Sequence, residues 1–437
     1  MTTAAKPALR FNGRLADLSQ TERIALFDRS TSFDAAIREQ TAGIVRDVRL
    51  RGDAALRDLA SRFDRVELDS LEVPRARWLA ALDALDPSLR RAMERSANNI
   101  RRAHEAFLPT AAECETEPGV IVGRRPDPLG RVGVYAPGGR AAYPSSLLMG
   151  AVPARVAGVG EVVVCSPPEA DGAPPNVLLA AAALADADRV FAIGGAGAVA
   201  AMAYGTETVP RVDRIVGPGN AYVAEAKLQV AGVVAIDSPA GPSELLVIAD
   251  ESSNPRAVAI ELLAQAEHDP RACVVVVATD ERVAEEIGEA ISLLLDDQPR
   301  REIIVQALAE RGGILSADSV DDAIAFSNEY APEHLLILAS NANEVLARIR
   351  NAGTIFLGAT ASVAFGDYMT GANHVLPTGG LARSYSGLSV LDFLRWTTYQ
   401  RVSARAAESL ARDVASFAEA ERLPGHALAA RSAGGEL

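Results

Sequence analysis

Four short apolar runs set the fold: RVGVYAPGG (131–139), EVVVCSPP (161–168), RVFAIGGAG (189–197) and DRIVGPGN (213–220). Ala- and Leu-rich stretches with a helical pattern separate them. Continuous apolar strands crossed by helices indicate parallel strands that are covered on both faces. The segment therefore predicts a doubly wound α/β unit.

The same alternation resumes further along the chain, in ELLVIAD (244–250), CVVVVATD (273–280), GGILSA (312–317), EYAPEHLLILA (329–339) and TIFLG (354–358). We therefore expect two tandem, incomplete Rossmann-like doubly wound domains in an α/β protein. A Gly-rich, strand-poor segment follows Thr360, and amphipathic patterns at about 388–415 and 417–430 predict a small C-terminal helical tail domain.

The composition excludes several classes of protein. With 437 residues, of which 49% are hydrophobic, the chain can bury a large core. A formal charge of −14 repels nucleic acid and anionic membrane surfaces. The longest apolar stretches, such as VLLAAAALA from Val177, reach about half of the roughly 18 residues that a membrane span needs. Three cysteines without a CxxC, and no apolar leader at the N-terminus, favour a cytoplasmic location.

Four of the five histidines lie near carboxylates or a glutamine, in AQAEHDP (264–270), APEHLL (331–336), GDYMTGANHVLPT (366–378) and AERLPGHALAA (420–430). Imidazole beside carboxylate serves both metal binding and proton transfer. His104, on an arginine-rich helix without such neighbours, is interpreted as a surface residue. Cys165 and Cys273 lie in apolar strand runs, where burial raises a thiol pKa and argues against a nucleophile.

Each histidine segment also has a purely structural interpretation. Gln265 and His268 lie three apart at a helix end that Pro270 stops, so they can converge on one ion, or His268 can cap the last carbonyl groups. Glu333 and His334 lie between a helix and a buried strand, at the sheet edge where active sites usually lie, or in a solvated turn. His426 follows Pro-Gly and would pass for a helix junction.

Two further segments carry glycines that suit function. The loop with Asp367 and His374 is Gly-rich and long, which is more typical of a functional loop than of a connection. Glycine turns after strands, in 134–146 and 216–223, can hold phosphate on backbone N–H groups. Gly195, Gly197 and Ala200 fit GxGxxA, but the acidic residue of a dinucleotide fingerprint is missing from the next strand end.

Taken together, the segments resemble the histidinol dehydrogenase family from about Arg10 to Ala430. Seven motifs occur in the family's order: VGVYAPGGRAAYPSSLLM, IVGPGNAYVAEAK, IDSPAGPSELLVIAD, LLAQAEHDP, YAPEHL, GDYMTGANHVLPT and LPGHA. The resemblance implies oxidation of L-histidinol to L-histidine by way of L-histidinaldehyde, with two NAD and one zinc ion per active site.

The resemblance also implies residue roles. The family's zinc ligands fall on Gln265, His268, Asp367 and His426, a borderline donor set that suits zinc and also contacts the substrate. The proton acceptors are Glu333 and His334, with His334 also touching substrate. Ser243, His374 and Glu421 fall on substrate contacts, Tyr135 and Asn220 on NAD contacts. Gly197 replaces a glutamine common in the family, which removes one NAD hydrogen bond of about 1 kcal/mol.

The resemblance further implies a homodimer whose C-terminal tails exchange, so that Glu421 and His426 complete the partner's site. The expected organisation is an N-terminal tail or arm (1–27), a metal and catalytic domain (28–134 with 238–380), an NAD domain (135–237) and the exchanged tail (381–437). Two alternatives stay open on the residues alone: a zinc-dependent amide or ester hydrolase with Glu333 as base, and a non-enzymatic zinc-stabilised binding protein.

Overall fold

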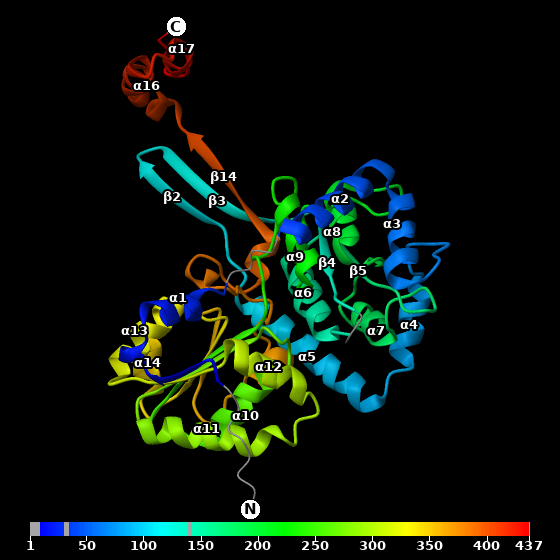
Figure 1. The fold of residues 1–437 in the computed structure, drawn as a ribbon. Coiled ribbons are helices and arrows are strands. Elements are labelled where there is room, and N and C mark those ends of the chain that lie inside the picture. The colour runs from blue at the N-terminus through cyan, green and yellow to red at the C-terminus, as the bar shows by residue number, and fades with distance from the viewer. Residues whose placement is uncertain (1–8, 30–34, 139–141, 437) are drawn as a thin grey trace, which may run out of the picture.

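The protein contains two all-parallel sheets packed between helices, and an arm that projects from the body (Figure 1). The computed structural model describes residues 9–29, 35–138 and 142–436. The predicted pair of α/β units with a small C-terminal helical part is confirmed. Residues 139–141 of the first glycine-rich motif, and residues 1–8 of the expected N-terminal tail, lie outside the described residues.

The first sheet has six strands in the order β1-β11-β10-β9-β12-β13. Alternate residues of its central strand β9 (Glu244–Ala249) pack into separate cores on its two faces. The other strands are β1 (Phe11–Arg14), β10 (Cys273–Ala278), β11 (Gly313–Ser316), β12 (His334–Leu338) and β13 (Thr354–Leu357). The connecting helices are α10 (Pro255–Ala266), α11 (Glu281–Leu295), α12 (Arg301–Arg311), α13 (Val320–Tyr330) and α14 (Ala342–Arg348).

The second sheet has five strands in the order β6-β5-β4-β7-β8. They are β4 (Arg131–Tyr135), β5 (Glu161–Ser166), β6 (Arg189–Ala192), β7 (Arg214–Val216) and β8 (Ala235–Ile236). The helices between them are α6 (Pro144–Ala157), α7 (Asn176–Leu184), α8 (Gly195–Tyr204) and α9 (Ala221–Val230). Burial of these strands among apolar helices explains their continuous Val and Ile runs.

Residues 28–134 were expected with the first sheet, but their helices share the core of the second. Val48, Trp78 and Ile100 are buried together with strands β4 to β6, because the apolar faces of these helices pack against α6 to α9. The helices are α2 (Ala35–Arg51), α3 (Asp53–Leu59), the π-helical turn η2 (Ala60–Asp64), α4 (Arg75–Asp83) and α5 (Pro87–Ala106).

The N-terminal segment is not a loose tail in its described part. Strand β1 pairs in parallel with β11 at the edge of the six-stranded sheet, and it buries Phe11 there. After η1 (Leu15–Asp17), helix α1 (Gln20–Phe27) begins at Ser19, whose side chain and that of Glu22 form a capping box.

The prediction of one helix over 388–415 is wrong, because part of this range forms a strand of the arm. Strand β14 (Leu394–Val402) pairs antiparallel with β3 (Val120–Pro128), which also pairs with β2 (Ala112–Glu117). The Trp, Thr, Tyr and Val content of β14 favours a strand wherever a partner edge is available. The arm ends in α16 (Ala404–Ala420) and α17 (Pro424–Ala433), whereas α15 (Val363–Tyr368), η3 (Leu381–Arg383) and η4 (Val390–Phe393) precede β14.

His104 was interpreted as a surface residue, and the structure shows it buried. Its ring lies under η4, where Nδ1 accepts a hydrogen bond of 3.2 Å from the N–H of Val390. Burial lowers the pKa of His104 to about 4, so the ring is neutral. It therefore links α5 to the segment that leads into the arm. No helix within the described ranges combines the length and the apolarity needed to cross a bilayer.

The glycine turn after β7 is held by a buried ion pair. Lys227 pairs with Asp237 and donates to the carbonyl of Gly217 over 3.0 Å. Asp237 in turn accepts from the Gly217 N–H over 2.7 Å. Gly217 has a φ of 111°, and a Cβ there would overlap the backbone carbonyl of Tyr135. Only glycine therefore fits this turn.

We predict that Gly217→Ala destabilises the protein by at least about 2 kcal/mol, because it combines a strained φ with a backbone clash. Gly232→Ala is the matched control, since nothing lies within 4 Å of a Cβ at that position and its φ is not positive. Calorimetric unfolding of both variants measures the difference. Equal unfolding temperatures would contradict this assignment.

Candidate active site

Glu333 and His334 lie in a buried turn at the amino end of β12. Ala331, in the left-handed region at φ 51°, and Pro332 end helix α13 just before them. The two side chains are buried, with exposed fractions of 5% and 4%. The sequence placed them correctly between a helix and a strand, but they lie at the amino edge of the sheet, opposite the edge that parallel sheets usually use.

The tautomer of His334 follows from its partner. Nδ1 lies 2.9 Å from the backbone carbonyl of Glu244, which can only accept, so in the neutral ring Nδ1 carries the proton and Nε2 has a free lone pair. Burial lowers the pKa of His334, but the Glu333 carboxylate, 3.4 Å from Nδ1, and that of Asp367, 3.9 Å from Nε2, outweigh it. The net effect raises the pKa to about 9.

Asp367 and His374 lie next to His334. The Nδ1 of His374 donates to the Asp367 carbonyl over 3.0 Å, and its Nε2 faces Ser146 Oγ at 3.1 Å. Burial lowers the pKa of His374, so its ring is neutral and accepts from the serine hydroxyl. Ser146 lies in the first turn of α6, in the five-stranded domain. This contact brings the carboxyl edge of that sheet to the catalytic dipeptide.

Gln265 and Asp367 belong to two helices that contact each other. The N–H of Val363 donates to the carboxylate of Glu261 over 3.1 Å, which sets α15 against the last turns of α10. Gln265 and Asp367 each follow this contact by four residues, or about one turn, and both helices run toward the amino edge of the sheet. The two side chains therefore lie on the same side as His334.

These donors fit a divalent cation. Gln265 is only 3% exposed, yet neither its amide nor the Asp367 carboxylate hydrogen-bonds to another described residue. The polar atoms of both side chains are not among the fully buried atoms without a partner, so an ion or a water molecule can reach them. His268, three residues after Gln265, is exposed at the helix end with its ring free to bind. Amide oxygen, carboxylate and imidazole are donors that zinc accepts.

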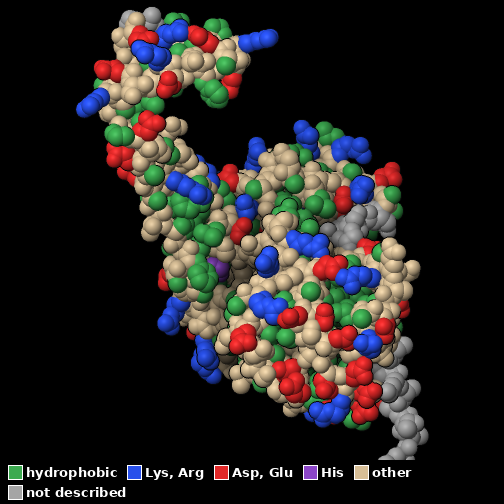
Figure 2. Space-filling view, turned by 90° about the vertical axis from the view of Figure 1, so that its left-hand side faces the viewer, with side chains coloured by type: hydrophobic (Ala, Val, Ile, Leu, Met, Phe, Trp, Pro, Cys, Tyr) green, Lys and Arg blue, Asp and Glu red, His purple; other side chains and the backbone are tan. Residues whose placement is uncertain are grey.

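Glu421 and His426 do not reach this centre within one chain. Both are exposed and lie in α16–α17 or their junction, at the tip of the arm (Figure 1). Figure 2 shows open space between this tip and the body. Accordingly, no group of three or more His, Cys, Asp or Glu side chains within the described ranges is arranged to hold a metal.

The glycine turns gather at the carboxyl edge of the five-stranded sheet. Tyr135 ends β4, and its hydroxyl accepts from the N–H of Gly195 over 3.1 Å. Burial raises the pKa of Tyr135 to about 12, which keeps the phenol protonated. Helix α8 begins there without a capping side chain, so backbone N–H groups are available to phosphate. Asn220 caps α9 with its Oδ1, which leaves its Nδ2 free to donate.

Ser243 and Gly197 complete the predicted set. Ser243 is half-buried just before β9, next to Glu244, and its carbonyl accepts from the N–H of Cys273. At Gly197 a Cβ would lie 2.8 Å from Leu59 on α3. A side chain there first meets α3, so the small residue also serves helix packing.

The buried cysteines are unsuited to nucleophilic catalysis. Burial raises the pKa of Cys273 to about 12 and that of Cys165 still further. Both thiols therefore stay protonated at neutral pH. The remaining cysteine, Cys114, is exposed on the arm.

Sequence reasoning missed two residues beneath the dipeptide, Glu244 and Arg29. Their ion pair is buried, with side chains only 2% exposed each. Burial raises the pKa of Glu244 to about 7, against the opposing effect of Arg29. The sequence offered one signal for Glu244, because it is an acidic residue at the start of an otherwise apolar strand. Arg29 gave none.

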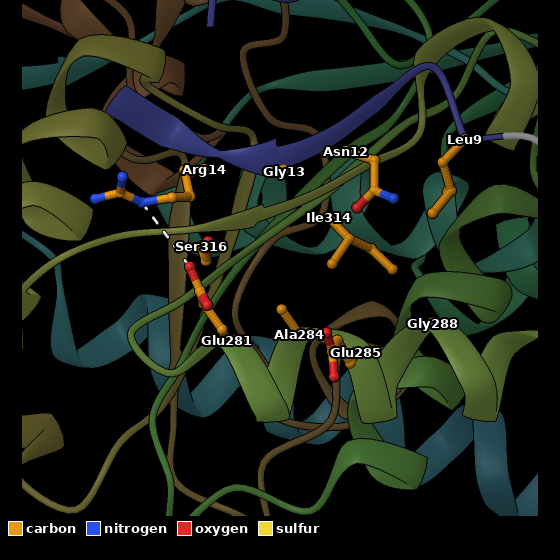
Figure 3. A pocket seen from close by; sticks show the side chains of 10 residues that line it. All are labelled: Leu9, Asn12, Gly13, Arg14, Glu281, Ala284, Glu285, Gly288, Ile314 and Ser316. Atoms are coloured by element: carbon orange, nitrogen blue, oxygen red, sulfur yellow. Dashed lines mark ion pairs between the residues drawn. The ribbon is translucent and has the colours of Figure 1, made fainter. Parts of the chain in front are cut away.

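One hollow of the body lies away from this site. It has a volume of about 370 Å³ and opens between β1, β11 and α11, near the carboxyl ends of the strands (Figure 3). Arg14 and Glu281 face each other across it at 3.8 Å. The catalytic dipeptide lies at the opposite edge of the same sheet.

Comparison with known proteins identifies the family. The family model for histidinol dehydrogenase matches residues 27–433. The chain belongs to the histidinol dehydrogenase family. Curated histidinol dehydrogenases from Methanosarcina mazei and Halobacterium salinarum are 48% and 51% identical to it, covering 95% and 94% of this chain and 95% and 96% of their own lengths. The crystal structure of histidinol dehydrogenase from Elizabethkingia anophelis matches with a TM-score of 0.92 at 35% identity, over 97% of this chain and 98% of that one.

The family assignment decides between the alternatives. The chain is an oxidoreductase, and neither a zinc hydrolase nor a binding protein without activity is favoured.

Proposed function

We propose that the chain oxidises L-histidinol to L-histidine by way of L-histidinaldehyde, with two NAD per turnover, in the cytoplasm. The observation that carries the proposal is the 3.1 Å contact between Ser146 and His374, because it joins the glycine-turn edge of one domain to the Glu333–His334 dipeptide of the other. A hydride acceptor bound at the glycine turns would thereby lie near the proton acceptor. NAD, when bound at the glycine turns, supplies the hydride acceptor for both oxidations.

Zinc would be held by Gln265, His268 and Asp367 of one chain and by His426 of the partner subunit. Bound there, it would orient the imidazole and amine of the substrate. The unpaired amide and carboxylate oxygens support this site. Ser243 and His374 would contact the same substrate from the cleft, and Glu421 of the partner subunit would bind its ammonium group.

His334 is the proton acceptor for the alcohol. In the neutral form of the ring, Nδ1–H is committed to the Glu244 carbonyl, so the proton of the substrate hydroxyl goes to Nε2 as hydride leaves the carbinol carbon. The oxidation gives the aldehyde, one NADH and one proton. The buried position of the ring excludes water from this transfer.

Glu333 prepares the second oxidation. Its Oε2 is fixed by the N–H of Glu244 at 2.6 Å, so the carboxylate is oriented to take a proton from a water that adds to the aldehyde carbonyl. His334 then accepts a proton from the hydrate as the second hydride leaves. The carboxylate product, a second NADH and two protons result. The buried thiols take no part, because their raised pKa keeps them protonated.

The first test measures stoichiometry. We expect two NADH per L-histidinol consumed, read from NADH absorbance and product analysis. A chelator should abolish the reaction and zinc should restore it, because the substrate loses its anchor without the metal. One NADH per substrate with accumulating aldehyde, or activity that survives thorough chelation, would contradict the proposal.

The second test separates cofactor binding from folding. Asn220→Asp preserves the helix cap, since Asp and Asn cap equally well, but it removes the Nδ2 donor and adds negative charge beside the phosphates. We expect an unchanged unfolding temperature and a Kd for NAD raised about tenfold, measured by calorimetric titration. Asn254→Asp is the matched control, because Asn254 caps α10 in the same way at the carboxyl edge of the other sheet. Equal effects in both variants would count against Asn220 as an NAD contact.

The third test concerns tail exchange. A Glu333→Ala chain and a His426→Ala chain are each expected to be inactive. In a dimer with one chain of each kind, tail exchange would combine the wild-type tail of the Glu333→Ala chain with the wild-type body of the His426→Ala chain. Such a dimer has one intact site. Equal mixing with subunit exchange should therefore restore about one quarter of the wild-type activity, as random C2 pairing requires. No recovery in verified heterodimers would mean that each site is built within one chain.

A further inference from the structure

Arg29 lies directly beneath the catalytic dipeptide, although it comes from the N-terminal segment. Its guanidinium pairs with the carboxylate of Glu244, donates to the carbonyl of Tyr330 and lies 3.4 Å from the centre of the Tyr330 ring. A buried ion pair adds little net stability, because desolvation of both charges offsets their attraction. Stability alone therefore gives a weak reason for this pair.

Glu244 is the residue through which this charge can act. Its carboxylate accepts from the N–H groups of Gly379, at 2.7 Å, and Glu333, at 3.3 Å. Its own N–H donates to Glu333 Oε2, and its carbonyl accepts from His334 Nδ1. The main chain of Glu244 thus holds Glu333 Oε2 and His334 Nδ1, and its carboxylate holds the N–H of Glu333.

We propose that Arg29 and Glu244 are positioning residues for the aldehyde oxidation, with the Arg29 guanidinium fixing the Glu244 carboxylate and, through its contact with the Glu333 N–H, the orientation of Glu333. This inference rests on the proposed function and deepens it. Both residues act by limiting the geometries that Glu333 can adopt.

The charge of Arg29 explains why the arrangement needs an arginine. Glu244 and Glu333 place two carboxylates close together at one buried edge of the sheet, and like charges there repel. The guanidinium compensates one of them and also bridges to the Tyr330 carbonyl, which fixes the end of α13 just before the dipeptide. Without it, the Glu244 carboxylate loses its only cationic partner among the described residues. No positive charge would then help to hold this carboxylate toward the N–H groups of Gly379 and Glu333.

The experiment compares Arg29→Gln in the wild-type chain and in a Glu333→Gln chain. We expect the wild-type background to lose at least about tenfold in kcat for L-histidinaldehyde oxidation, with KM and the Kd of NAD changed less than about threefold. In the Glu333→Gln background the additional loss should be less than about threefold, because the group being positioned is already disabled.

Two further variants keep the test decisive. Arg29→Lys retains the charge and should recover most of the activity, whereas the isosteric Glu244→Gln should lose it as Arg29→Gln does. Arg23→Gln is the matched control: Arg23 also joins the N-terminal segment to α13, through Glu329, but at the surface, and we expect wild-type kinetics.

The outcomes are distinguishable. Equal losses from Arg29→Gln in both backgrounds, or a loss that tracks a lowered unfolding temperature, would overturn the positioning role. Full activity of Glu244→Gln would do the same. A wild-type chain that forms no NADH from L-histidinol would overturn the proposed function, and this inference with it.

Discussion

The parallel pairing of β9 with β12 is the constraint on which the active site depends. In its register His334 lies opposite Leu245, so the main-chain groups of Glu244 meet the dipeptide. The Glu244 carbonyl then fixes the His334 tautomer, and its N–H orients the Glu333 carboxylate. A slip of one residue would turn these side chains to the other face of the sheet. Ordinary sheet pairing therefore supplies most of the geometry that acid–base chemistry needs here.

The second constraint is that the carboxyl edge of one parallel sheet lies against the amino edge of the other. The five-stranded sheet presents its carboxyl edge, where glycine turns leave N–H groups uncapped. The six-stranded sheet presents its amino edge, where burial and backbone partners hold ionisable side chains. The contact between Ser146 and His374 lies where the two edges meet. The glycine turns and the Glu333–His334 dipeptide thus come from separate domains, and this contact joins their edges.

The sequence predicts the local pattern well and the long-range contacts poorly. Apolar runs such as 244–250 and 273–280 are strands, and Glu333 with His334 lies between a helix and a strand as expected. The edge of the sheet, the strand at 394–402 and the burial of His104 depend on partners distant in the chain. Arg29 and Glu244 are 215 residues apart, and no local periodicity connects them. The same limit applies to the tail, whose destination no pattern specifies.

The arm supports tail exchange on energetic grounds. The core that α16 and α17 share consists of Ala415, Ala418 and Ala427, which bury little apolar area. Phe417 and Leu428, by contrast, are largely exposed on the same helices. Two short helices with an alanine core do not bury enough surface to offset their conformational entropy, so they need a further apolar surface. In the proposed dimer, a second copy of this chain would offer such a surface, and His426 and Glu421 would then reach the zinc and substrate sites proposed for its body. The exposed helices of the arm and the incomplete set of donors in the body are thus the two features that the proposed dimer would bring together.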